Sequence, residues 1–156
     1  MKKLHAIAAV SALAVATGVS ALETGSNGKN EWACGGAGAE ERADMKTLES
    51  VATASLLFIT EKRGGYLADV DFVVRDQQGA AVLQGRADGP MCVLRVPAGR
   101  YRVDATYEGV KRSASMQAAR AAGKPTRTVL TFPLDPSETI APSPEEKAQA
   151  RAVSLN

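Results

Sequence analysis

Three aspartates, Asp69, Asp71 and Asp76, come closest in this sequence to a set of metal ligands. Asp69 and Asp71 lie two residues apart and so share one face of an expected strand, which Asp76 ends. Several oxygens of this kind could bind calcium, but the spacing matches no loop template such as Asp-x-Asp-x-Asp-Gly. We expect solvated strand carboxylates instead, with Asp76 and Asp88 setting turns through hydrogen bonds to the backbone. No metal or other cofactor is predicted.

Histidine occurs once in the 156 residues, as His5. Nucleophilic catalysis by Ser-His-Asp or Cys-His groups in its usual form needs a histidine base, and the usual zinc sites also use histidine. If residues 1–21 are removed during export, the remaining chain has no histidine. The sequence therefore predicts a protein that is not an enzyme.

Residues 1–21 have the features of a secretory signal peptide. Lys2 and Lys3 form a positive start, residues 6–19 form an apolar stretch, and residues 19–21 are small, as a cleavage site requires. The apolar stretch has about 14 residues, whereas a membrane span needs roughly 20. We expect cleavage after Ala21 and a mature protein that is exported to a bacterial periplasm, with no membrane span.

Two cysteines, Cys34 and Cys92, remain after the expected cleavage. An even number of thiols in an oxidising compartment favours a disulfide, which would close a loop of about 57 residues and stabilise the fold by about 4 kcal/mol in the chain-entropy model. The alternative is that Cys92 is a buried apolar residue, because it alternates with Leu94 and Val96 on the inward side of a strand. Neither cysteine lies in a Cys-x-x-Cys motif, so thiol redox catalysis is not expected.

Charge is balanced in the expected mature chain. The full chain has 19 basic and 17 acidic residues, and the signal removes only Lys2 and Lys3, which leaves 17 of each. General affinity for nucleic acid is therefore not expected. Basic residues are nevertheless concentrated between residues 95 and 127, which indicates a weak anion-attracting face. Its candidate contact residues are Arg100, Arg102, Lys111 and Arg112; the alternative is ordinary solvated strand faces.

The mature chain divides into three parts. Residues 22–55 contain a Gly- and Asn-rich leader, expected to be loose up to Ala33 with Trp32 as its anchor, and then a helix over 39–53. Residues 56–134 form the β domain, and residues 135–156 form a proline-interrupted tail. The β domain contains seven short segments of strand character separated by Gly and Pro turns: 56–60, 68–75, 81–86, 91–96, 100–107, 110–118 and 127–134.

The segment from Arg100 to Tyr107 gives the clearest strand signal. Tyr101, Val103, Ala105 and Tyr107 share one face, and the polar residues between them share the other. Strict alternation of this kind is typical of an antiparallel strand with one buried face. Together with the short links between segments, it predicts an all-β fold: a seven-stranded antiparallel, Ig-like sandwich with one N-terminal helix.

The order of turns and strands resembles a known family. The elements that carry the likeness are Asp76-x-x-Gly79, Asp88-Gly89-Pro90 and Val96-Pro97-Ala98-Gly99-Arg100-Tyr101-Arg102-Val103. They are similar to the carboxypeptidase regulatory-like domain, a prealbumin (transthyretin)-like sandwich. With the Gly-rich segment 35–42, the chain resembles small exported proteobacterial proteins that carry this domain alone. In metallocarboxypeptidases the similar domain is a non-catalytic companion of a zinc domain, so the resemblance implies a fold rather than an activity.

Two functions follow as expectations. The first is an exported, non-catalytic β-sandwich module that binds an envelope protein or has a structural role in the cell envelope. The second is a periplasmic protein that binds a small ligand or anion through the basic residues at 100, 102, 111 and 112. A hydrolase without histidine is the least favoured reading.

Overall fold

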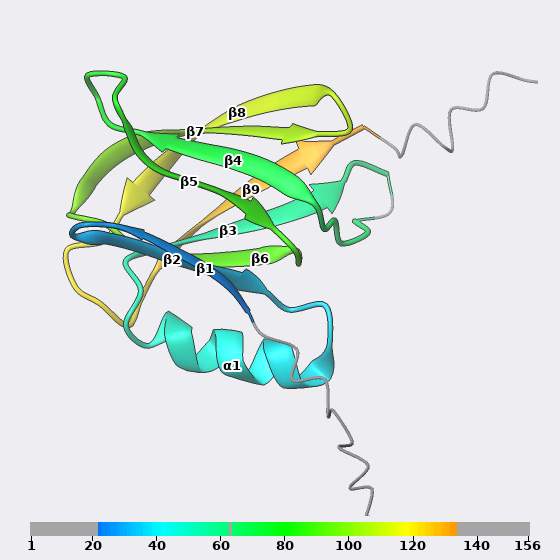
Figure 1. The fold of residues 1–156 in the computed structure, drawn as a ribbon, viewed down its shortest axis with the longest axis horizontal. Coiled ribbons are helices and arrows are strands. Elements are labelled where there is room, and N and C mark those ends of the chain that lie inside the picture. The colour runs from blue at the N-terminus through cyan, green and yellow to red at the C-terminus, as the bar shows by residue number, and fades with distance from the viewer. Residues whose placement is uncertain (1–21, 63, 134–156) are drawn as a thin grey trace, which may run out of the picture.

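The structure is a computed structural model that describes residues 22–62 and 64–133 (Figure 1). The expectations for the signal peptide and for the tail at 135–156 lie outside the described residues. Two sheets and one helix make up the described part. Its elements in chain order are β1 (Glu23–Asn27), β2 (Asn30–Gly35), α1 (Ala39–Glu49), β3 (Ala54–Thr60), β4 (Val70–Arg75), β5 (Ala81–Ala87), β6 (Met91–Arg95), β7 (Gly99–Tyr107), β8 (Val110–Ala118) and β9 (Thr126–Phe132).

The two sheets have the strand orders β1-β2-β6-β3-β9 and β5-β4-β7-β8. The prediction of an all-β, two-sheet fold with one helix is confirmed. The count of seven strands is wrong, because the described residues form nine. The expectation of antiparallel pairing fails for one pair, since β3 and β9 run parallel. The chain reaches β9 by crossing from β8 to the edge of the other sheet, and such a crossover does not return as a hairpin does.

The two additional strands come from the segment expected to be a loose leader. Residues 27–30 form the turn between β1 and β2, and Gly28 has a φ of 62°, which glycine adopts without a steric cost. β2 then pairs with β6, and Trp32 lies opposite Leu94 in that register. The leader therefore folds as a hairpin at the edge of the first sheet, because its tryptophan is buried in the core.

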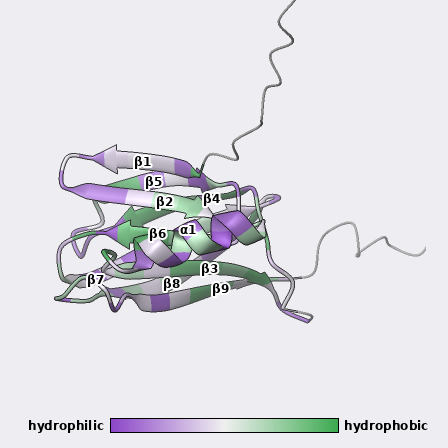
Figure 2. Cartoon of the chain, turned by 90° about the horizontal axis from the view of Figure 1, so that it is seen from below, coloured by the Kyte–Doolittle hydropathy of each residue, from purple (hydrophilic) through white to green (hydrophobic). Residues whose placement is uncertain are grey.

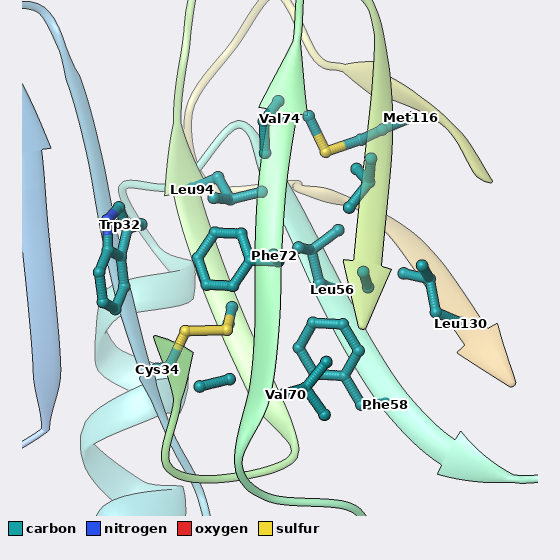
Figure 3. Close-up of a cluster of buried hydrophobic side chains, with 14 of the residues drawn as sticks. Trp32, Cys34, Leu56, Phe58, Val70, Phe72, Val74, Leu94, Met116 and Leu130 are labelled. Carbon is teal, nitrogen blue, oxygen red and sulfur yellow. A yellow bond between two sulfur atoms is a disulfide. The ribbon is translucent and has the colours of Figure 1, made fainter. Parts of the chain in front are cut away.

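The inward faces of both sheets meet in one hydrophobic core, shown in Figure 3. Phe58, Phe72 and Phe132 are its largest fully buried side chains. The predicted alternation in β7 is confirmed, since Val103 and Ala105 are buried. The half-buried Tyr101 donates a hydrogen bond from its hydroxyl to the Pro97 carbonyl at 2.8 Å, which satisfies the polar end of an inward aromatic.

Trp32 fills the space where the two sheets meet at β1 and β5. Its ring packs edge-on against Phe72, with the ring centroids 5.3 Å apart. Gly25 on β1 and Gly85 on β5 lie against the indole so closely that a Cβ at either position would overlap it. These two glycines therefore make room for the tryptophan, and the burial of its ring connects the hairpin to the second sheet.

Helix α1 covers part of the outer side of the first sheet (Figure 2). Met45 and Ala52 form a second buried cluster with Ala33 on β2 and Val93 on β6. The Glu41 carboxylate accepts hydrogen bonds from the Gly36 and Ala37 N–H groups, both at 3.0 Å, and so holds the turn before the helix. Within the described residues, no helix has the length and apolar character that a membrane span requires.

Candidate contact surface

Three of the four basic residues predicted as a contact surface lie together on the solvent side of the β5-β4-β7-β8 sheet. The strand registers place Arg100, Arg102 and Lys111 on the same side, opposite the buried Val103 and Ala105. We call this side of the sheet the outer face. Its residues are Asp71, Val73, Arg75, Gln84, Arg86, Arg100, Arg102, Asp104, Thr106, Lys111, Ser113, Ser115 and Gln117.

Asp104 is the centre of a hydrogen-bonded cluster on the outer face. Its carboxylate accepts hydrogen bonds from Ser113 Oγ at 2.6 Å, Arg102 Nε at 2.7 Å and Arg75 Nε at 3.1 Å. These donors, Ser113 foremost and then the two guanidinium groups, hold the pKa of Asp104 below its ordinary value of 3.8. The two arginines face each other across β4 and β7, so one carboxylate holds two cations in fixed positions.

The lowered pKa of Asp104 predicts how stability depends on pH. A carboxyl whose pKa is lower in the folded state stabilises that state above its unfolded pKa, and the contribution disappears as pH falls through the folded pKa. We therefore expect Asp104→Asn to be less stable than the wild type at pH 7, with the difference shrinking below about pH 4. Urea unfolding of both proteins from pH 7 to pH 3 measures this, and a difference that stays constant would contradict it.

Arg86 neutralises the aspartates that the sequence offered as a weak metal site. Its guanidinium lies 3.2 Å from the Asp69 carboxylate and 3.4 Å from that of Asp71. Asp76 instead accepts hydrogen bonds from the Gln78 and Ala80 N–H groups, both at 2.9 Å. The expectation that Asp76 sets a turn is confirmed. Across residues 22–62 and 64–133, no group of three or more histidine, cysteine or acidic residues could hold a metal ion.

Arg100 and Lys111 are the unpaired cations of the outer face. Both side chains are exposed. Neither has a hydrogen-bonding or ion-pair partner among the residues that the structure describes. Their charges are therefore available to a binding partner without first breaking an internal contact.

Arg112, the fourth predicted contact residue, lies at the edge of the sheet, where it lines the same hollow as Arg102 and Lys111 but does not share their strand phase. In the β7–β8 register it lies opposite Ala105, on the inward side. At this edge of the sheet its Nε donates to the Thr131 carbonyl of β9 at 3.1 Å, and its Nη2 lies 3.6 Å from the Glu61 carboxylate. Arg112 thus joins the edges of the two sheets, where the open side of β9 needs a hydrogen-bond donor.

The outer face is hollowed over its centre. An open depression of about 670 Å³ lies over β4, β7 and β8, with Gln84 at its β5 side. Its charged lining residues are the cations Arg75, Arg102, Lys111 and Arg112 and the carboxylates Asp71 and Asp104, so the lining is net positive. This part of the sheet can therefore receive a ligand that presents hydrogen-bond acceptors and negative charge.

The predicted pairing of the cysteines is confirmed. Cys34 on β2 and Cys92 on β6 form a disulfide between directly opposed residues, and both are fully buried (Figure 3). The alternative of an isolated buried thiol at Cys92 is therefore wrong. The bond joins the N-terminal hairpin to the central strand of the first sheet.

Arg75 and Arg86 are the functional candidates that the sequence analysis missed. Each lies on an alternating strand, and the strand phase alone would have placed both on the outer side. The association of Arg75 with Arg102 and Asp104 depends on the pairing of β4 with β7, two strands whose paired residues are about 30 positions apart in the chain. Arg86 on β5 instead contacts Asp69 and Asp71. Comparison of the chain with protein-family models, with curated proteins and with solved structures gives no match.

Proposed function

We propose that the protein is an exported, non-catalytic β-sandwich module that binds an acidic partner protein in the cell envelope through its outer face. The observation that carries this proposal is the charge of the face. Five cationic side chains lie on it against the carboxylates of Asp71 and Asp104, with Asp69 beside them. A net positive surface attracts an acidic partner and accelerates its association.

Export is supported by the buried disulfide, since such bonds persist in oxidising compartments. Cleavage after Ala21 is also compatible with the fold. The first strand begins at Glu23, so cleavage after Ala21 leaves every described strand intact. The side chain of Leu22 packs against Gly35 and belongs to the cluster beneath α1.

The charges near residue 22 are compatible with a new N-terminus at that position. Burial, followed by the neighbouring carboxylates of Glu41 and Glu23, raises the pKa of Asp88 above its ordinary value of 3.8. Cleavage after Ala21 would create an α-ammonium group at Leu22, directly before Glu23. This positive charge would offset the repulsion among the three carboxylates.

The resemblance to the carboxypeptidase regulatory-like domain belongs to the same proposal. The seven strands expected from the sequence pattern correspond to β3 to β9. We infer a prealbumin-like sandwich to which the β1–β2 hairpin has been added. This inference is consistent with a binding role, because the similar domain of metallocarboxypeptidases is not catalytic.

The charge of the outer face can be tested by reversal. We expect the triple variant Arg100→Glu, Arg102→Glu, Lys111→Glu to remain folded, because these side chains are exposed and surface charges contribute little to stability. Its capture of acidic envelope proteins should be lost, and wild-type capture should fade between low and moderate salt. Affinity capture followed by mass spectrometry measures both effects.

A matched control distinguishes an effect of the outer face from an effect of net charge alone. Lys29→Glu, Lys46→Glu and Lys124→Glu change the charge by the same amount at exposed positions away from the outer face. This control should capture partners as the wild type does. Equal loss in both triple variants, or capture that does not respond to salt, would refute the outer face as the contact surface.

A small anion is the second candidate ligand, favoured by the hollow of about 670 Å³ on the outer face. Hollows of roughly 300–1,000 Å³ accommodate small molecules. Saturation by a ligand raises the melting temperature according to its concentration relative to Kd. A screen of inorganic and organic anions that gives no thermal upshift would exclude this alternative.

A further inference from the structure

We propose that Arg75 and Arg102 form a two-guanidinium clamp for a carboxylate of the partner protein, with Asp104 and Ser113 as its positioning residues. The inference rests on the proposed function, because it names the chemical group that the outer face recognises. It adds a specific site to what is otherwise a general positive charge.

The geometry leaves the binding ends of both arginines available. Arg102 bonds Asp104 through Nε, and Arg75 bonds the same carboxylate through its own Nε. Arg75 Nη1 also donates to the Gly79 carbonyl at 3.2 Å. Among the described residues, no hydrogen-bond partner occupies Arg75 Nη2 or either Nη atom of Arg102. Three N–H-bearing nitrogens therefore remain for a ligand.

The cluster also carries a net positive charge, which an anion would balance. Arg75 and Arg102 lie directly opposite each other on adjacent strands, an arrangement that is destabilising for like charges. One carboxylate neutralises only one of them. A second oxyanion, supplied by the partner, would complete the balance and could accept paired hydrogen bonds from a guanidinium fork.

Preorganisation distinguishes this site from an ordinary surface arginine. The side chain of Asp104 is 27% exposed, and Ser113 Oγ fixes its Oδ1. Each arginine is thus held at Nε before a ligand arrives, so less side-chain entropy is lost on binding. The hollow beside the two arginines gives an extended acidic segment room to approach.

The test uses two probes and two variants of the full mature chain. The probes are a hexaglutamate peptide, with hexaglutamine as its neutral control, and inorganic phosphate. Binding is followed by nuclear magnetic resonance of the arginine Nε–Hε signals. We expect hexaglutamate to shift the signals of Arg75 and Arg102 and hexaglutamine to leave them unchanged.

The variants separate preorganisation from bulk charge because the two explanations predict opposite signs. Asp104→Asn makes the face more positive by one charge, so attraction by charge alone would strengthen hexaglutamate binding. The clamp instead predicts weakening by about two- to fivefold, because both Nε anchors lose the carboxylate. Arg102→Lys keeps the charge but loses the fork, and the clamp predicts a similar weakening.

Three outcomes overturn the proposal. The first is unchanged or tighter hexaglutamate binding by Asp104→Asn, and the second is unaltered binding by Arg102→Lys. The third is a response to phosphate but not to hexaglutamate, which would assign the site to a free anion. Circular dichroism establishes that both variants are folded. The test needs no cellular partner, so its failure is distinguishable from failure of the outer face to bind a protein in the envelope.

Discussion

Replacing Val103 by aspartate is expected to unfold most of the protein at 25 °C. Val103 is fully buried in the centre of β7, so the new carboxylate would lie among apolar side chains without a partner. Burial of an unpaired charge costs several kcal/mol, which is comparable to the total stability of a small domain. Thermal unfolding followed by circular dichroism measures the effect.

The matched control places the same carboxylate on the other side of the sheet. Ser115 is exposed and lies opposite Arg102 in the β7–β8 register. We expect Ser115→Asp to change the free energy of unfolding by less than about 0.5 kcal/mol, as is usual for surface substitutions. Similar damage from both variants would mean that the assigned strand phase is wrong.

Removal of the disulfide is the second change with a large expected effect. The variant Cys34→Ala, Cys92→Ala frees a loop with a sequence separation of 58. In the chain-entropy model the free energy of unfolding falls by about 4 kcal/mol. The β1–β2 hairpin should be the first part to unfold, because the bond joins it to β6.

Urea unfolding with and without reductant tests this prediction. Without reductant, the wild type should unfold at a clearly higher urea concentration than the double variant. With reductant present throughout, the two midpoints should approach each other, because both chains then lack the bond. Equal midpoints under oxidising conditions would show that the bond contributes nothing to stability.

Local patterns predicted much of the fold. The alternation from Arg100 to Tyr107 placed β7 and its buried face correctly, since a period of two reports which side of a strand is covered. β1 gave no comparable signal. Its residues Glu23–Asn27 contain no large apolar side chain, and Gly25 is inward only because Trp32 needs the space. A contact of this kind depends on tertiary packing rather than on sequence periodicity.

The candidate surface could likewise be predicted from local patterns only in part. Arg100, Arg102 and Lys111 could be placed together because one hairpin turn fixes the register of β7 and β8. Arg112 was included for its charge, although the phase it shares with Ala114 and Met116 assigns it inward. Arg75 was missed because its neighbour Arg102 lies on a strand that is distant in the chain. The register between strands that are distant in the chain depends on the packing of the whole core rather than on the local sequence.

The most direct test of the proposed function is site-specific photo-cross-linking in intact cells. A photoreactive amino acid replaces Lys111 on the outer face in one strain, and Lys46 on α1, which covers the other sheet, in a second strain. Both positions are exposed, so both variants should fold and be exported alike. The outer-face proposal predicts a defined acidic protein cross-linked from position 111 and not from position 46. Cross-links from position 46 alone, or the same products from both, would contradict it.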